Sequence, residues 1–298
     1  MRITQNMITN DLLRSLNRNQ NELAGIQNKV STGKQINKPS DGSLKFASSQ
    51  KLEELLKRNE QYQNNAENGV FQARFAQSAL ENTLDQLFEL KTLVTRGAND
   101  KVPSPSDMEI LANQIVQIRQ ELVDYFNSSA DGRYIFAGTN TLTRPFELAE
   151  DGSVTYSGND DALAARVNDN TEVDISVDGN RLQNFGSGDS IFSLLDRVET
   201  AFRNAEYSAL NQEIPSVDAA VEHFAGLAAE IGNNINRMEF AVEQFEVGNI
   251  NLQSEVSRLV DTDYAESLSQ IQKLQVAYQA ALSANASLLQ TSLLNFLR

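Results

Sequence analysis

The acidic side chains between residues 147 and 200 are the first candidates for chemistry, because this stretch carries twelve Asp/Glu against three Arg. Asp160-Asp161, or Asp169 with Glu172 and Asp174, would supply the oxygen ligands that calcium prefers. A calcium loop needs an Asp-x-Asp-x-Asp-Gly run followed by a distant Glu, and that spacing is absent. Paired carboxylates also cleave glycosides, but nothing in the sequence singles out a pair. We interpret the block as a solvated acidic face and predict no metal site.

Other side chains suited to catalysis are scarce. The chain has no Cys, which excludes disulfides, thiol catalysis and Cys-based zinc sites. His223 is the single His, so a catalytic triad or zinc site would have to use it without a second His. We place His223 on the flank of a packed helix. Gly186-Ser187-Gly188 lacks the Lys and the strand-to-helix context of a phosphate loop. The sequence therefore predicts no catalytic residue, no cofactor and no enzymatic activity.

Composition limits the partners of the chain. A net charge of −15 disfavours nucleic acid and anionic membrane. No stretch reaches the roughly 18 consecutive apolar residues of a membrane span. The start, Met1-Arg2-Ile3-Thr4, lacks the apolar region and cleavage site of a signal peptide. Composition alone favours the cytoplasm and leaves a non-cleaved export route open.

The first 35 residues have the pattern of a helix with one narrow apolar seam. Its members follow alternating steps of four and three, which is a heptad repeat with one polar position. Gly33-Lys34 matches a helix end, and 37–42 reads as a turn. The seam residues are Leu12, Leu16, Asn19, Leu23, Ile26 and Val30.

The last segment, 264–298, has a second heptad seam and very little charge. Only Glu266, Lys273 and Arg298 are charged, so this helix lacks the solvation that a free surface helix keeps. That favours burial inside an assembly. The seam residues are Tyr264, Leu268, Ile271, Gln275, Tyr278, Leu282, Leu289 and Phe296, with Asn285 and Ser292 as further polar members.

Between the ends, long helical patterns surround a β-rich middle. We expect a helix over 44–96, then one from a capping box at Ser106 and Glu109 to about 128. We expect strands at 134–138, 154–156 and 173–177, and helices from Ser190 and again after Pro215. Asp261-Thr262-Asp263 interrupts the last pattern. The sequence predicts a mainly α fold with a small β-rich insertion, whose long helices form a coiled-coil bundle that the terminal helices complete on assembly. The expected regions are a 1–43 assembly helix, a 44–132 arm, a 133–189 outer domain, a 190–260 returning arm and a 261–298 assembly helix.

Neither terminal helix can bury much surface alone, and isolated helices are costly to form. Each therefore needs a partner, which is the other terminus, another copy, or both. Antiparallel helices inside one ordinary bundle would give the same pattern, so periodicity leaves that alternative open. The polar members Asn19, Gln275 and Asn285 either fix the register of a coiled coil or sit at a tolerant rim.

Three motifs resemble the bacterial flagellins and their hook-associated relatives. Residues 31–42, Ser-Thr-Gly-Lys-Gln-Ile-Asn-Lys-Pro-Ser-Asp-Gly, are similar to the family's turn between its first two helices. Residues 131–139, Asp-Gly-Arg-Tyr-Ile-Phe-Ala-Gly-Thr, with Pro145-Phe146, resemble the hook-filament junction branch. Residues 261–265, Asp-Thr-Asp-Tyr-Ala, match the entry to the last helix, and 288–297 match its ending. The sequence departs from this pattern at Gly42-Ser43.

This resemblance implies a secreted structural subunit of the flagellum at the hook-filament junction. Members of the family pass unfolded through the flagellar type III export channel, and their terminal helices fold into a tubular core on assembly. The implied partners are other copies of the chain, a neighbouring hook-associated protein, flagellin, and an export chaperone at the C-terminal helical region. Two alternatives stay open: a short flagellin that forms the filament itself, and a secreted binding module or enzyme carried by the β-rich middle.

Overall fold

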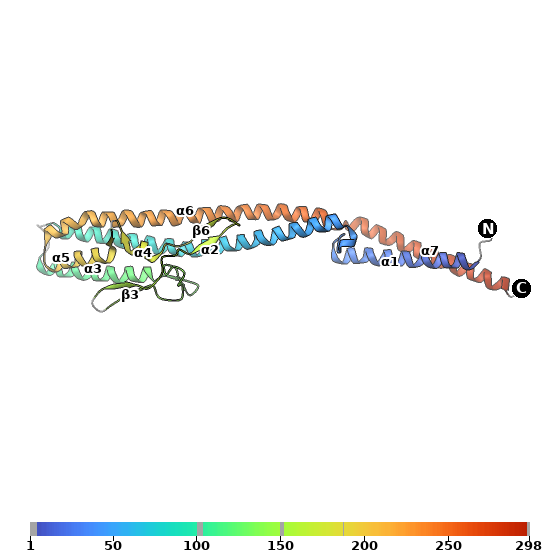
Figure 1. Ribbon diagram of the computed structural model, residues 1–298, viewed down its shortest axis with the longest axis horizontal. Helices are drawn as coiled ribbons and strands as arrows, with labels where there is room; N and C mark the ends of the chain where they lie inside the picture. Colours follow the sequence, from blue (N-terminus) through green and yellow to red (C-terminus); the bar gives the residue numbers. More distant parts are fainter. Residues whose placement is uncertain (1–4, 100–103, 150–151, 187, 297–298) are drawn as a thin grey trace. The chain divides into compact units, whose positions relative to one another are not determined.

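The computed structural model describes residues 5–99, 104–149, 152–186 and 188–296 (Figure 1). The chain divides into two compact units. The terminal unit comprises Met1–Arg58 and Gly248–Arg298, and the central unit comprises Asn59–Val247. The division runs through two long helices, α2 (Ser43–Gly97) and α6 (Tyr207–Val260), each of which contributes to both units.

The terminal unit is built from helices. Helix α1 (Gln5–Thr32) lies beside α7 (Tyr264–Phe296), as Figure 1 shows, and a 3-10 turn, η1 (Pro39–Asp41), precedes α2. The predicted end of the first helix at Gly33 is confirmed, because Gly33 has φ +71, a left-handed conformation that glycine adopts without steric cost.

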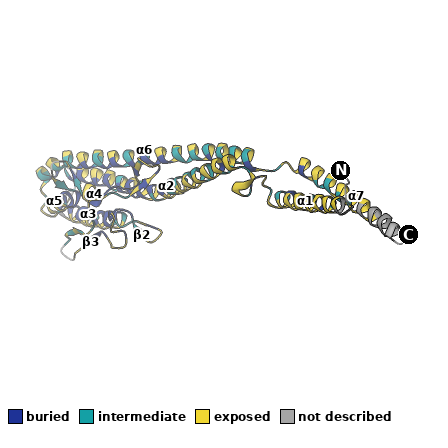
Figure 2. Cartoon of the chain, turned by 45° about the vertical axis from the view of Figure 1, so that its right-hand side comes forward, coloured by how far each residue is buried: buried dark blue, intermediate teal, exposed yellow. Residues whose placement is uncertain are grey.

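The central unit holds the large hydrophobic core. Helices α3 (Pro105–Phe126) and α5 (Ile191–Arg203) pack along each other and against α2 and α6. Phe126 lies at the centre, stacked on Phe224 with ring centroids 5.9 Å apart and edge-on to Phe192 at 5.8 Å. Figure 2 shows the buried residues of this unit as an internal band along its helices.

Four small antiparallel hairpins and one short helix make up the β-rich insertion of the described chain. This confirms the predicted fold class of long helices with a small β-rich insertion. The hairpins are β1 (Ser129–Ala130) with β2 (Arg133–Tyr134), β3 (Phe146–Leu148) with β4 (Val154–Tyr156), β5 (Ala164–Arg166) with β6 (Glu172–Asp174), and β7 (Asn184–Phe185) with β8 (Asp189–Ser190); the helix is α4 (Gly179–Gln183).

Four local predictions were wrong. The strand expected at 173–177 ends at Asp174, as part of β6. The strand expected at 134–138 pairs only at Arg133–Tyr134, since the following residues turn inward to bury Ile135 and Phe136 in the core. The cap of α3 is Ser104, whose hydroxyl accepts from the Asp107 backbone N–H at 3.3 Å, and not Ser106. Pro215 lies inside α6 instead of preceding it.

Packing on both sides of Pro215 explains why the helix continues through this residue. A proline inside a helix removes one hydrogen bond and crowds the preceding turn, at a cost of about 3 kcal/mol. Leu210 and Val217 are both fully buried in the core. Their burial stabilises a helix that continues through the proline, which local propensity alone would not do.

A buried arginine ties α3 to α5. The Arg119 side chain is only 6% exposed and donates to Asp196 at 2.5 Å and to Glu199 at 2.8 Å. Two carboxylates therefore compensate the desolvation of one guanidinium, which makes this crossing sensitive to loss of either partner. Three further ion pairs, nearer the surface, add links: Arg197 bridges Asp189 and Glu213, and Arg181 pairs with Glu230 at 2.6 Å.

We expect a fragment of residues 59–247 to fold on its own, because the core described above lies entirely within the central unit. Circular dichroism should show high helicity and one cooperative thermal transition. Removal of 1–40 or 260–298 from the full chain should likewise leave the central unit folded. A fragment that binds hydrophobic dyes and melts without cooperativity would contradict this expectation.

We expect Glu230→Gln to change the acid sensitivity of the central unit. The side-chain hydrogen bond from Arg181 lowers the pKa of Glu230, so its stabilising contribution is present above the unfolded-state pKa of about 4.3 and is lost as the pH falls through the lower folded-state pKa. The variant should be less stable by roughly 0.2–1 kcal/mol at pH 7, with the difference vanishing in acid. Urea titrations across pH measure this, with Glu222→Gln on the same helix as control. A deficit that persists at pH 2 would contradict the assignment.

Candidate assembly interface

The two motifs at the ends of the chain meet in one crossing inside the terminal unit. The Gln35 backbone N–H donates to Val260 O at 2.6 Å, and that of Thr262 donates to Gly33 O at 2.9 Å. Lys34 and Asp261 form an antiparallel bridge between them. The sequence predicted two separate turns but not their pairing. Backbone hydrogen bonds between segments more than 200 residues apart produce no periodic pattern of residue types in the sequence.

Side chains fix both strands of this crossing. The Asp41 carboxylate accepts from the backbone N–H groups of Asn37 and Lys38, each at 3.1 Å. The bond from Asn37 is the main cause of the lowered pKa of Asp41. On the other strand, Asp263 caps α7 by accepting from the Ala265 N–H at 2.8 Å and the Glu266 N–H at 3.1 Å. Both terminal helices are therefore anchored at one end.

Gly33 has a second constraint besides its backbone angle. A Cβ at this position would lie 2.9 Å from the Tyr264 hydroxyl oxygen. The first residue of α7 thus packs directly on the last turn of α1. A side chain at Gly33 would be strained and would also push α7 away.

The predicted seam of α1 forms one face of the helix that packs along α7. Leu16 and Ile26 are each 8% exposed, and the other four members are half-buried. Asn19 lies within this face as its polar member. The neighbours of these residues along the helix are mainly exposed, as the yellow colour of most of α1 in Figure 2 shows. In this chain the N-terminal seam has a partner in its own C-terminal helix.

The predicted seam of α7 is divided. Ile271 and Tyr278 are half-buried, but Tyr264, Leu268 and Leu282 are 52%, 51% and 45% exposed. Gln275 is exposed as well. The Leu289 and Phe296 side chains, and that of Asn285, lie outside the described residues.

The less exposed face of α7 follows a neighbouring frame that the sequence analysis missed. It has the same steps of four and three, and it shares Ile271 and Tyr278 with the predicted seam. The heptad search counted large apolar side chains, so it did not assign small Ser and Ala residues to a seam. Its members are Ser267, Ile271, Leu274, Tyr278 and Ala281.

The apolar stripe of α7 is thus wider than one helix covers. The exposed edge is a ridge of Tyr264, Leu268, Gln275 and Leu282, of which the last three are spaced by seven residues; we call it the α7 ridge. Leu and Tyr side chains left half in water carry a favourable free energy of burial, of about 25 cal/mol per Å². This arrangement can bind a further helix.

The candidates for catalysis belong to the central unit. His223 is half-buried on α6, with Nε2 2.7 Å from the Arg181 carbonyl oxygen and its ring edge-on to Phe224. Among the described residues, no group of three His, Cys, Asp or Glu side chains is placed to hold a metal ion. Within that same part of the chain, no helix is long and apolar enough to cross a bilayer.

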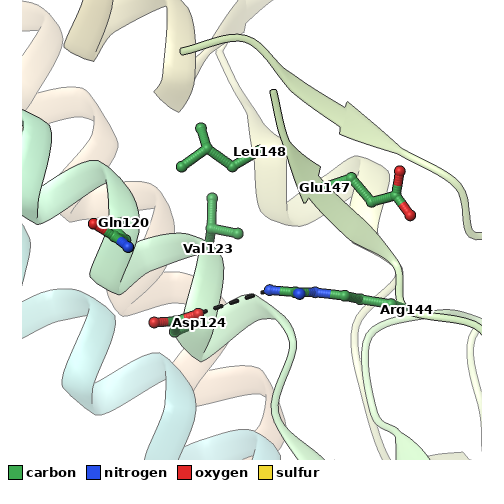
Figure 3. Close-up of a pocket in the computed structure, with 6 residues that line it drawn as sticks. All are labelled: Gln120, Val123, Asp124, Arg144, Glu147 and Leu148. Atoms are coloured by element: carbon green, nitrogen blue, oxygen red, sulfur yellow. Dashed lines mark ion pairs between the residues drawn. The ribbon is translucent and has the colours of Figure 1, made fainter. Parts of the chain in front are cut away.

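A shallow hollow of about 430 Å³ lies between α3 and β3 in the central unit (Figure 3). Arg144 and Asp124, both exposed, are 3.8 Å apart across it. Gln120, Val123, Glu147 and Leu148 complete its lining. The six lining side chains thus include two carboxylates and one guanidinium, and no Ser, Thr, Cys, Lys or His.

Comparison with known proteins identifies two matching family models. The bacterial flagellin N-terminal helical region matches residues 3–141, and the bacterial flagellin C-terminal helical region matches residues 214–297. Flagellin FlaB1 of Treponema pallidum is 29% identical over 284 residues, covering 92% of this chain and 91% of the relative. Flagellar hook-associated protein 3 of Escherichia coli is 22% identical over 307 residues, covering 95% and 96%.

The fold is also similar to that of a solved protein. The crystal structure of the flagellar junction protein FlgL from Legionella pneumophila superposes with a TM-score of 0.60 at 15% identity, covering 73% of this chain and 99% of that one. At this identity the likeness concerns the fold alone.

We expect Gly33→Ala to loosen the terminal unit by about 1–2 kcal/mol, the cost of a left-handed conformation for a residue with a Cβ. Backbone amides of α1 and α7 should exchange with solvent faster, while those of α3 and α5 should be unchanged. Gly25→Ala in α1 is the matched control, because an added Cβ there meets nothing within 4 Å and alanine favours a helix. Equal exchange in both variants would contradict the role of Gly33.

Proposed function

This chain belongs to the bacterial flagellin family, and we propose that it is the subunit that joins the flagellar hook to the filament, with no catalytic role. It is a structural component of the flagellum, exported to the outside of the cell. The observation that carries the proposal is the α7 ridge, an apolar surface that α1 leaves uncovered. We propose that 1–43 and 261–298 are the assembly segments and that neighbouring helices cover this ridge.

The motifs in the middle of the chain favour the junction over the filament. Gly132-Arg133-Tyr134-Ile135-Phe136-Ala137-Gly138, with Pro145-Phe146, is the signature that resembles the junction branch. In the structure Phe136 and Phe146 are almost completely buried, so this signature forms part of the core. The FlgL fold supports the same assignment.

The partners follow from this position in the flagellum. We propose contacts with other copies of the chain, with a neighbouring hook-associated protein on one side and with flagellin on the other. We also propose that an export chaperone binds the C-terminal helical region before secretion. The α7 ridge offers the apolar surface that such a chaperone would cover.

A short flagellin is the second candidate, and the identity of 29% with Treponema pallidum FlaB1 favours it. One experiment distinguishes the junction function from the filament function. Cells that lack their filament should carry this protein on the ends of isolated hooks if it is the junction subunit. If the purified chain instead polymerises unaided into long filaments, the junction assignment is wrong and the filament assignment is right.

We expect Leu268→Asp and Leu282→Asp to abolish attachment to hooks and swimming, because each places a charge on the α7 ridge that assembly must bury. The free protein should melt within about 1–2 °C of the wild type, since both side chains are already half in water. Motility in soft agar and thermal denaturation measure the two effects.

The matched control is Val276→Asp, which changes a 66% exposed side chain of the same helix outside the ridge. We expect this variant to swim. A large loss of stability in the ridge variants would instead mean that the ridge belongs to the fold of the single chain.

A further inference from the structure

We propose that neighbouring copies pack side by side through two uncharged faces of the central unit, one on α2 and one on α6. This inference rests on the proposed assembly function and adds the surfaces by which one copy meets the next. The contact is head to tail: the α2 face of one copy meets the α6 face of another.

The α2 face is a run of exposed side chains at steps of three and four, with no charge among them. Phe71 and Phe75 stand at its centre, 52% and 43% exposed, with their rings edge-on and the centroids 5.1 Å apart. Two aromatic side chains in contact with each other and with water form an unusual surface for an acidic protein. The α2 face consists of Asn64, Asn68, Phe71, Phe75, Ser78 and Asn82.

The α6 face has the same character. Phe240 and Val247 are 62% and 54% exposed, and the other members carry amide side chains. Amides next to aromatic rings suit an interface, because they form hydrogen bonds without the desolvation cost of a charge. The α6 face consists of Asn233, Asn236, Phe240, Gln244 and Val247.

The distribution of charge favours these two faces as the site of contact between copies. Residues 59–247 contain 12 Lys/Arg against 31 Asp/Glu, so two central units repel each other. Exposed carboxylates border the α2 face: Glu60 at one end, Asp85 and Glu89 at the other, and Glu67 along its edge, one turn before Phe71. A close contact between two such units avoids like-charge repulsion only where the carboxylates are missing. This requirement favours another copy as the occupant, since a basic partner would gain most by docking on the carboxylates.

The two faces lie on opposite sides of the α2 and α6 pair. The inner sides of the helices meet, because a Cβ added at Gly69 would lie 2.7 Å from the Met238 sulfur and the rings of Tyr62 and Phe245 are 6.1 Å apart. The residues of each face are spaced so that they point away from this contact. One copy therefore offers one face to each of two neighbours, which is the arrangement that builds a ring or a helix of subunits and not a closed pair.

The two faces also lie at the same position along the helix axes. Arg74, between Phe71 and Phe75 in sequence, is paired at 2.7 Å with Glu239, which precedes Phe240. This ion pair crosses from α2 to α6 and neutralises the two charges next to the aromatic residues. Neighbouring copies can thus bring their aromatic side chains together without sliding along the helix axis.

Cysteine cross-linking in assembled flagella tests the contact, and the natural chain has no Cys to interfere. The full chain with Asn68→Cys and Gln244→Cys keeps every aromatic side chain. It is expressed in place of the wild type, and isolated flagella are treated with a flexible bis-maleimide. We expect a ladder of covalent dimers, trimers and larger products, and we expect each single-cysteine chain to remain a monomer.

The matched control pairs Phe88→Cys with Gln244→Cys. Phe88 is on α2 and is 52% exposed, like Phe71, but lies off the α2 face among the acidic residues Asp85 and Glu89. We expect this chain to be incorporated and to give no ladder.

The remaining outcomes separate the two proposals. Incorporated Asn68→Cys, Gln244→Cys protein that gives no ladder overturns the lateral contact and leaves the junction function intact. Dimers from a single-cysteine chain, or products with the mass of a different flagellar protein, also overturn it. Absence of the wild-type chain from flagella would instead contradict the proposed function itself.

Discussion

The crossing between residues 33–35 and 260–262 is the interaction on which the terminal unit depends. Its backbone hydrogen bonds join two segments from opposite ends of the sequence. Helix α1 ends at this crossing and α7 begins at it, and the two helices lie side by side beyond it. A helix anchored at one end has already lost part of its conformational freedom, so the packing of α1 on α7 needs less apolar burial to be stable. This explains how a seam of only six residues holds α1 in place, and why the wider stripe of α7 still has a surface to spare.

The central unit has the opposite design. Phe126, Phe146, Phe192 and Phe224 form a compact aromatic group, and Arg119 adds a buried ionic link between α3 and α5. Such a core is complete without a neighbour. The unit can therefore meet other subunits through its outer faces alone, where acidic side chains limit close approach and the aromatic and amide residues of α2 and α6 permit it. The central unit offers two uncharged faces and the terminal unit an uncovered ridge, so the proposed contacts of the two units differ in kind.

Several elements could be predicted because their signals are local. The end of α1 at Gly33, the long uninterrupted α2, the strand at 154–156 and the break at Asp261-Thr262-Asp263 all follow from residue type and spacing. The errors share a different cause. The helix continues through Pro215 because Leu210 and Val217 are buried. Residues 135–137 are not in a strand because their side chains are buried in the core. In each case tertiary burial outweighs a local preference of a few kcal/mol or less.

The sequence by itself determined the family, the helical ends around a β-rich middle, and the seam of α1. Heptad spacing and the end motifs are local patterns, each contained in a short stretch of the chain. Only the tertiary structure decided which edge of the α7 stripe is covered. Ser267, Leu274 and Ala281 face inward while Leu268 and Leu282 stay half in water, since α1 contacts α7 along one line that the crossing sets. The pairing of the two end motifs and the uncharged faces of α2 and α6 were likewise beyond the sequence, because they depend on which residues the fold leaves outside.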